Sequence, residues 1–450
     1  MNFWFFAGEF AFIALFLFFF FFFVSSFREK EKKAFRRSLY FLLFLMIFNA
    51  VILLLKDILR SWFFGGIFIF LVAGVFLVLF FPLLKKPIQI IGEQKKIDER
   101  DTIFARFDYR EGTEIFEEYY KKNPEFKEID EEIRKLPDLH TPPHLKKDPL
   151  LLSLAVSEFD FLRHQVTKVD GEICAEKIDL SSQANTYFIK KAVNYLGSEL
   201  CGISLLDQAY VYSHVGRGPE PYGKRIELDH KYAIVFALEM DFKMITSAPS
   251  APVIVETGKQ YIEAARISII LSNLIRHLGY SARAHVAGSN YQAILPPLGW
   301  LAGLGELGRL GILVTWKYGP RARLGLVTTD LLLVPDEPRV FGVQNFCEKC
   351  HKCATNCPAQ AIPLGRKKEE NGVLKRALKK EECYRYWRKA GTDCAICIFV
   401  CPYSKPDNYF HNFIRRLTTR SSISQSFSVW ADDFFYGRFP ERRKRSLLGI

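Results

Sequence analysis

Eight cysteines in the C-terminal part of the chain have the spacing of iron–sulfur ligands. The first four form a run with two, two and three intervening residues, and a proline follows the last of them: Cys347, Cys350, Cys353 and Cys357. This is the bacterial ferredoxin run, and in ferredoxins with two clusters its fourth cysteine ligates the other cluster. The other four are a single cysteine and a second run that also ends in proline: Cys383, Cys394, Cys397 and Cys401. Eight thiolates are enough for two clusters with four ligands each.

The crossover rule predicts which cysteines hold each of two [4Fe–4S] clusters. One cluster is predicted to bind Cys347, Cys350, Cys353 and Cys401, and the other Cys357, Cys383, Cys394 and Cys397. The irons of a cubane lie a few ångströms apart, so a short loop must turn three sulfurs inward. Such clusters carry single electrons at potentials of about −400 mV in some ferredoxins. We therefore expect this part of the chain to deliver electrons to an acceptor.

Zinc and disulfides are the alternatives for these cysteines. Zinc knuckles favour C-x2-C pairs separated by longer loops, and disulfides are rare in cytoplasmic domains. Both alternatives fit the two runs less well than clusters do. Two further cysteines stand outside the runs, Cys174 and Cys201. These two are predicted to be buried and inert.

The head of the chain has the composition of a membrane domain. Of the 42 phenylalanines, 24 precede residue 85, and uncharged runs cover 10–27, 38–55 and 61–84. A helix needs about 20 mainly apolar residues to cross the hydrocarbon layer. We therefore predict an all-α membrane domain of three transmembrane helices over residues 1–86. A cleaved signal peptide is the alternative, but three successive spans without a small-residue cleavage site speak against it.

Basic residues predict the orientation of these spans. The loop at 28–37 carries six Lys or Arg residues, whereas the loop at 56–60 carries two. Because basic loops stay in the cytoplasm, the first loop and the long C-terminal region are both expected there. The protein is thus predicted to be a multi-pass protein of the cytoplasmic membrane, with its bulk on the cytoplasmic side. The pair Arg36-Arg37 resembles a twin-arginine export signal, but it follows a complete hydrophobic span, and we prefer a stop-transfer interpretation.

The net charge of +13 does not indicate a nucleic-acid partner. The basic residues are scattered or explained by membrane topology, and no helix-turn-helix or RNA-binding signature is present. Residues 87–150 are predicted to be a charged connector, in which runs such as 128–134 form solvated surface.

The middle of the chain alternates helical and strand patterns. Apolar runs predict strands at 232–238, 282–286 and 324–333, and helical spacing predicts a helix over 260–278 that closes at Gly279. This mixture is typical of an α/β sheet packed by helices. The segment from Gly303 to Gly308 satisfies G-x-G-x-x-G. A dinucleotide site would need a strand directly before it and an acid about 20 residues later, so NAD(P) or FAD binding is disfavoured here.

From about residue 150 to its end, the chain resembles corrinoid-dependent reductive dehalogenases. The resemblance rests on the two cluster motifs and on the stretches IRHLGYSA (275–282), GLGELGRLG (303–311), YGPRAR (318–323), TTDL (328–331) and WADDFFYG (430–437). These pieces occur in the family's order over roughly 300 residues. The catalytic region is also distantly similar to epoxyqueuosine reductases, which share the corrinoid and two-cluster layout.

This resemblance implies a nitroreductase-like α/β (α+β) core that binds base-off cobalamin, followed by a ferredoxin-like module with two [4Fe–4S] clusters. The expected domains are a corrinoid-binding catalytic domain at 151–340, the cluster module at 341–410 and an extension packing on the core at 411–450. Like family members, the chain lacks the D-x-H-x-x-G motif of base-on corrinoid proteins. Close backbone approach to the corrin is the role implied for the glycine-rich segment, with Gly303, Leu304, Gly305 and Gly308 as the contacts.

The resemblance also implies the catalytic residues. Tyr261, at the start of the predicted helix and 19 residues before Tyr280, resembles the family's proton donor. Replacing carbon–halogen by carbon–hydrogen needs two electrons and a proton, which a phenol with a pKa of about 10 can supply at neutral pH. Arg323 corresponds to a cation that would stabilise the tyrosinate, and Asn290 to a polar residue that faces the substrate.

Three functions compete. We favour a membrane-anchored reductive dehalogenase that acts on a small organohalide and takes electrons from a low-potential donor such as a ferredoxin, a flavodoxin or a membrane reductase. The second is a tRNA-modifying relative of epoxyqueuosine reductase, which in its family uses an Asp where Tyr261 stands here. The third is a non-catalytic iron–sulfur electron-transfer protein of the membrane. Respiratory family members usually carry an export signal and a separate anchor subunit, which the fused spans would replace here.

Overall fold

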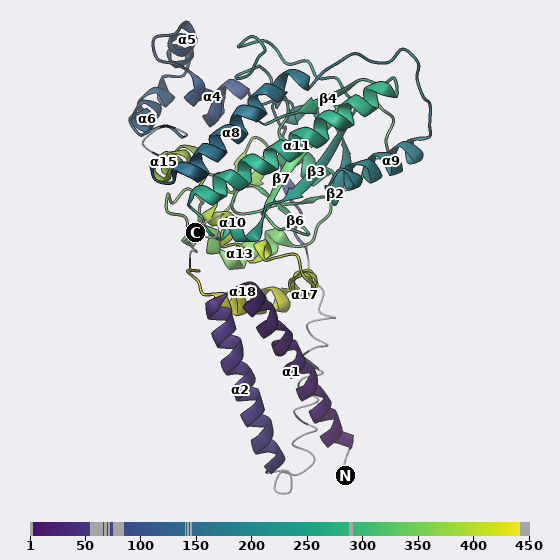
Figure 1. The fold of residues 1–450 in the computed structure, drawn as a ribbon, viewed down its shortest axis with the longest axis vertical. Helices are drawn as coiled ribbons and strands as arrows, with labels where there is room; N and C mark the ends of the chain where they lie inside the picture. Colours follow the sequence, from purple (N-terminus) through teal and green to yellow (C-terminus); the bar gives the residue numbers. More distant parts are fainter. Residues whose placement is uncertain are drawn as a thin grey trace. The chain divides into compact units, whose positions relative to one another are not determined.

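The chain divides into two compact units. The structure is a computed structural model that describes residues 3–54, 85–139, 146–287 and 291–441, together with positions 66, 70, 73, 74, 141 and 144. The first unit contains residues 1–86, 345–350 and 406–441, and the second contains residues 87–344 and 351–405. Figure 1 labels most of their helices and strands. The domain boundaries expected from the sequence stay predictions.

The second unit holds most of the helices and all described strands. Its helices are α4 (Ile103–Asp108), α5 (Glu114–Lys122), α6 (Pro124–Arg134), α8 (Pro149–Gln165), α9 (Ser182–Tyr195), α10 (Phe242–Ile245), α11 (Ala251–His277), α12 (Leu295–Leu301), α14 (Lys352–Thr355), α15 (Lys380–Ala390) and α16 (Ile396–Phe399). Its strands are β1 (Gln89–Ile90), β2 (Leu200–Leu205), β3 (Tyr232–Glu239), β4 (Ala282–His285), β5 (Gly305–Leu307), β6 (Leu313–Thr315), β7 (Ala322–Thr329), β8 (Lys368–Glu370) and β9 (Val373–Lys375).

A four-stranded sheet forms the centre of the second unit. Its order is β2-β3-β7-β4, and every neighbouring pair is antiparallel. The predicted strands at 232–238, 282–286 and 324–333 are therefore confirmed as β3, β4 and β7, although β7 ends at Thr329. The mixed helix and strand core is also confirmed, and its antiparallel sheet makes it an α+β fold.

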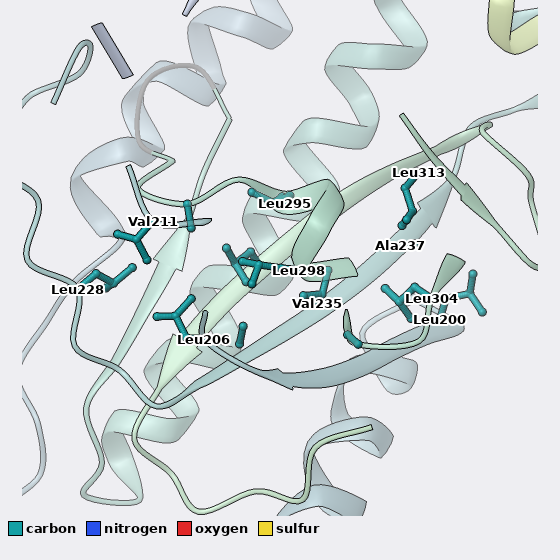
Figure 2. Close-up of a cluster of buried hydrophobic side chains, with 14 of the residues drawn as sticks. Leu200, Leu206, Val211, Leu228, Val235, Ala237, Leu295, Leu298, Leu304 and Leu313 are labelled. Carbon is teal, nitrogen blue, oxygen red and sulfur yellow. The ribbon is translucent and has the colours of Figure 1, made fainter. Parts of the chain in front are cut away.

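Alternation along β3 builds a hydrophobic core on each face of this sheet. Ile234 and Phe236 pack with side chains of α9 and α11, whereas Val235 and Ala237 pack with α12 and the β5–β6 hairpin. Figure 2 shows the second of these clusters, in which Leu298 of α12 lies over the sheet. Because side chains alternate along a strand, each residue of β7 also faces one of these two layers.

Helix α11 begins earlier than its sequence pattern indicates. The helix starts at Ala251, so the prediction that Tyr261 stands at its start is wrong, whereas its end beside Gly279, with φ +85°, is confirmed. Residues 251–258 are all buried. A helix surrounded by protein needs no apolar stripe, so these two turns carry no helical periodicity.

The stretch expected to be a charged connector contains a buried ion pair. Arg106 of α4 donates to both carboxylate oxygens of Asp130 in α6, at 2.9 and 2.7 Å, and neither side chain is exposed. The Tyr120 hydroxyl also donates to Asp130, at 2.9 Å. The expectation that 128–134 is solvated surface is therefore wrong for Asp130, because charge in the sequence does not show which carboxylates find a buried cation.

The first unit contains two long apolar helices and a C-terminal helical hairpin. Its helices are α1 (Phe3–Arg28), α2 (Lys32–Leu54), α17 (Tyr409–Thr418) and α18 (Ser422–Tyr436). Helix α13 (Val343–Cys350) has its first two residues in the second unit and the others in the first. By length and composition, residues 6–28 and 32–54 could each cross a membrane. Both agree with predicted spans, whereas the third predicted span at 61–84 lies largely outside the described residues.

Candidate active site

Tyr261 lies in the third turn of α11, where a guanidinium faces its ring. The Cζ atom of Arg323 is 5.0 Å from the ring centroid, which is a cation–π contact. On another side, the Phe159 ring of α8 meets Tyr261 edge-on at 6.5 Å. Tyr261 is half-buried, and within the described part of the chain its hydroxyl forms no hydrogen bond. The two residues predicted as proton donor and cation are therefore neighbours, and the phenol is left available.

Two residues that the sequence analysis did not single out hold Arg323 in place. Arg323 Nη2 donates to Thr257 Oγ1 at 2.7 Å and to Asp393 Oδ2 at 3.0 Å. The Thr257 hydroxyl in turn donates to the same Asp393 oxygen at 2.5 Å. Thr257 lies one helical turn before Tyr261, so α11 presents both the ring and the acceptor that Arg323 contacts. We call Thr257, Arg323 and Asp393 the arginine clamp.

The electrostatics of Arg323 keep it charged. Burial lowers the pKa of Arg323, but Tyr261, Asp393 and other nearby groups outweigh burial, and the net pKa is raised. Its Nε is buried and has no hydrogen-bond partner in the described part of the chain. One polar atom of the guanidinium is therefore left over for a bound molecule.

Aromatic side chains extend the site beyond this pair. Tyr291 packs on the same buried cluster as Tyr261, and burial together with Tyr261 raises the pKa of Tyr291. Burial also raises the pKa of Tyr212 to about 12. Trp300 packs on the core between α12 and the sheet, and its buried indole Nε1 has no partner among the described residues. Sequence composition gave no signal for these three residues, because aromatic side chains in a core are ordinary. Asn290, the predicted polar residue facing substrate, lies outside the described residues.

The glycine-rich segment does not open a helix, as a dinucleotide site requires. It follows α12, and its centre is strand β5, which pairs with β6. A Cβ atom on Gly305 would come within 2.4 Å of the Val314 carbonyl oxygen, so this glycine permits close pairing of the hairpin. Gly303 has φ +72°, a conformation that favours glycine. Leu304 is buried in the core shown in Figure 2. Contact of Gly303, Leu304, Gly305 and Gly308 with a corrin stays a prediction.

The four cysteines assigned to the second cluster lie near one another within the second unit. Burial raises the pKa of Cys383 to about 11 and that of Cys394 to about 12, and the Cys357 thiol adds to both shifts. Burial likewise raises the pKa of Cys397, and the thiols of Cys394, Cys383, Cys353 and Cys357 add to the shift, so a cysteine assigned to the first cluster also lies near this set. The Ala361 backbone N–H donates to Cys357 Sγ at 3.3 Å. Crowded thiols with a backbone donor suit an iron–sulfur cluster, whose positive irons stabilise the thiolates.

The loops that carry these cysteines turn sharply. Three non-glycine residues in these loops adopt the left-handed backbone conformation: His351, Cys394 and Ala395, with φ of 56°, 56° and 52°. This agrees with the expectation that short loops must turn their sulfurs inward. Cys347 and Cys350 belong to the first unit and Cys353 and Cys401 to the second, so the assignment of these four to one cluster stays a prediction. Cys174 is exposed, which contradicts its expected burial.

Comparison with known proteins identifies the cysteine-rich segment. Residues 346–405 match the family model described as a 4Fe-4S dicluster domain. The prediction of iron–sulfur clusters is thereby confirmed. In the part of the chain that the structure describes, no three His, Cys, Asp or Glu side chains converge as ligands of a single metal ion. The assignment of each cysteine to a cluster therefore rests on motif spacing and stays a prediction.

Curated relatives share a longer stretch. The chain is 33% identical over 302 residues to a tetrachloroethene reductive dehalogenase of Desulfitobacterium hafniense, which covers 57% of this chain and 54% of that protein. It is 28% identical over 282 residues to a tetrachloroethene reductive dehalogenase of Sulfurospirillum multivorans, covering 55% and 56%. A shorter match, 33% over 116 residues, is to an epoxyqueuosine reductase of Lactococcus garvieae. The chain thus spans about half the length of the reductive dehalogenases.

A solved structure shows the same fold. The catabolic reductive dehalogenase NpRdhA matches with a TM-score of 0.65 at 24% identity, covering 79% of this chain and 49% of that chain. The two-cluster segment, the shared stretch and the shared fold all agree with the resemblance inferred from the sequence. The chain is therefore similar to reductive dehalogenases, which are oxidoreductases, over rather more than half of its length, and over a shorter stretch to an epoxyqueuosine reductase.

Proposed function

We propose that the protein is a membrane-anchored reductive dehalogenase in which Tyr261 gives the proton that replaces the halogen. The observation that carries the proposal is the arginine clamp, which fixes a cation against the ring of a half-buried tyrosine. A phenol gives up a proton more readily where a cation stabilises the tyrosinate. An electron-transfer protein without catalysis has no need for such a pair.

One buried donor beside the Tyr261 ring is left for a bound molecule. Arg323 Nε has no partner in the described part of the chain, and buried polar groups are ordinarily hydrogen-bonded. We infer that base-off cobalamin binds here against Gly303, Leu304, Gly305 and Gly308. When bound and reduced to Co(I), cobalamin supplies the chemistry that removes halogen from an organohalide.

The chain's own residues supply the rest of the reaction. Two electrons and one proton convert a carbon–halogen bond into a carbon–hydrogen bond and a halide ion. The eight cysteines of the two motifs would hold two [4Fe–4S] clusters, which would supply single electrons from a low-potential donor such as a ferredoxin, a flavodoxin or a membrane reductase. The proton leaves the Tyr261 hydroxyl, and the tyrosinate is stabilised by Arg323 until it is reprotonated. Asn290 would orient the substrate.

Halide release tests this proposal directly. The chain is purified anaerobically in detergent with cobalamin, reduced, and given a panel of haloalkenes and haloaromatics that includes tetrachloroethene, the substrate of the curated relatives. Halide release that depends on reductant and on Tyr261 supports the proposal. Full cluster and cobalamin loading without halide release from any member of the panel would leave the electron-transfer alternative standing.

Membrane attachment through the N-terminal helices is part of the proposal. Large apolar side chains of α1 and α2 face outward, among them Phe10, Phe21, Ile47 and Leu54, and soluble proteins rarely expose such continuous apolar surface. With the third span at 61–84, the basic loop at 28–37 and the catalytic part would both face the cytoplasm. A phosphatase fused after residue 90 should be inactive and a fluorescent protein there should be bright. The opposite result would invert the topology.

A further inference from the structure

Helix α18 has two apolar faces, and the first unit covers one of them. Phe435 packs against Phe22 of α1, with ring centroids 4.7 Å apart, and against Phe19 at 6.0 Å. A second stripe with spacings of four, three and four residues is exposed: Ile423, Phe427, Trp430 and Phe434. Rings of this stripe contact one another, with Trp430 stacked on Phe434 at 5.3 Å. A surface helix of a soluble protein normally has one apolar stripe, so the second requires a partner.

Helix α17 presents a matching stripe of aromatic and basic residues. Tyr409, Phe413 and Arg416 of α17 and Arg420 in the turn that follows it have the same spacing, and all four are exposed. Aromatic rings beside arginines are typical of surfaces that lie at a membrane interface, where the rings enter the acyl boundary and the cations meet phosphates. A helix stripe of this kind differs from a solvated face, which would carry charges of both signs.

Contacts within the first unit join this hairpin to the basic ends of α1 and α2. His411 of α17 contacts Glu29, which follows α1, with Nε2 and Oε1 2.9 Å apart, and Asn408 Nδ2 donates to the same oxygen at 2.9 Å. Arg37 of α2 lies over the Phe434 ring, 5.4 Å from its centroid. Figure 1 shows α18 running across the ends of both long helices. The exposed stripes are therefore located where the apolar helices would leave the bilayer.

We propose that the hairpin formed by α17 and α18 lies on the lipid headgroup layer, with its exposed aromatic stripe in the acyl boundary and Arg416 and Arg420 on lipid phosphates. Three observations favour lipid over a protein partner. The stripe adjoins helices whose outer surfaces are apolar, and Arg37 stands beside the stripe as an interfacial cation. The exposed Arg416 and Arg420 complement anionic headgroups. The proposal rests on the membrane attachment proposed above.

Fluorescence quenching in proteoliposomes tests the hairpin separately from the attachment. The full chain and its Trp430→Phe variant are reconstituted into phosphatidylcholine and phosphatidylglycerol vesicles with or without bromine on the upper acyl carbons. The difference between the two proteins isolates Trp430 from the other tryptophans. Bromolipid quenching of this difference is expected, together with weak quenching by aqueous iodide. The double variant Arg416→Glu, Arg420→Glu should reduce the bromolipid quenching, whereas the control Lys121→Glu, Lys122→Glu on α5 should not.

Two outcomes separate failure of the hairpin from failure of the anchor. If carbonate washing leaves the chain in the vesicles but Trp430 emission is insensitive to bromolipid, α17 and α18 face water or protein and the inference is overturned. If carbonate releases the chain, the membrane anchor itself fails, and the inference fails with it.

Discussion

Asp393 accepts a hydrogen bond from Arg323 at 3.0 Å and directly precedes Cys394, a predicted cluster ligand. The cation that faces Tyr261 is therefore tied to the loop that carries a cluster thiol. In the proposed reaction, electrons and a proton must reach the same substrate, and this contact joins the cation beside the proposed proton donor to the loop of a predicted cluster ligand.

Replacing Tyr261 by phenylalanine is expected to reduce halide release by about 10²–10⁴-fold, the usual loss when a general acid is removed. The ring and its contact with Arg323 remain, so iron and cobalt contents should match those of the parent chain. Tyr195→Phe, at an exposed position on α9, is the matched control and should be fully active. Turnover above about a tenth of the parental rate would mean that the proton comes from elsewhere.

Asp393→Asn should lower kcat by about 10–100-fold, the loss typical of residues that hydrogen-bond to a functional side chain and fix its orientation. Asparagine keeps the shape of the side chain but not the charge that compensates Arg323. Since Asp393 is not expected to touch substrate, KM should change little. Asp393→Glu should recover part of the rate, and the exposed Asp229→Asn serves as the control. If the variant has full iron content and an unchanged kcat, the arginine clamp has a structural role only and does not contribute to catalysis.

Anaerobically purified protein should contain about eight irons per chain, four for each cubane, together with cobalt. Cys357→Ala is expected to remove the signal of the second cluster and spare the first, as electron paramagnetic resonance can show. Cys174→Ala, at an exposed cysteine outside both runs, should lose no iron. Zinc in place of iron, or loss of the first cluster's signal alone in Cys357→Ala, would refute the ligand assignment.

Asp130→Ala should destabilise the second unit by about 3–5 kcal/mol, because it removes the buried partner of Arg106 and leaves only Glu381, at 3.1 Å, to compensate that charge. Glu118→Ala breaks the exposed pair with Lys122 and should destabilise the unit far less, because solvent screens that pair. Urea unfolding in detergent, followed by tryptophan emission, compares the two variants. Equal effects would show that the Arg106–Asp130 pair is screened by water.

Stability should fall as pH rises through neutrality because of Glu158. Burial and then Glu256 raise its pKa from the usual 4.5 to about 7. Between these two pH values the folded chain holds a proton that the unfolded chain has lost, so the stabilisation is complete below about 4.5 and is lost as pH passes 7. Glu158→Gln should therefore raise the melting temperature at pH 8 more than at pH 5. An equal rise in melting temperature at pH 5 and pH 8 would contradict the raised pKa of Glu158.

The sequence predicted the parts of the site that motifs mark and missed those that tertiary contacts create. Tyr261 and Arg323 were found through the family order of short stretches, and the cysteines through spacing. In the sequence, Thr257 has no feature that distinguishes it from other helix residues, and Asp393 lies 70 residues after Arg323. No local sequence pattern therefore links either residue to Arg323. Likewise, apolar runs located β3, β4 and β7, but strand order and direction depend on pairing partners far along the chain.

The sheet order has a consequence for how the protein is made. β3 and β4 do not pair with each other, and both pair with β7, the last of the four strands to be synthesised. A nascent chain emerges from its N-terminus, so β3 keeps an unpaired edge until residue 329 has left the ribosome. Every cysteine of the two runs follows that point. The core can thus close before any of these ligands is available, which would make cluster insertion a late step of maturation, performed on a chain in which Tyr261 and Arg323 are already together.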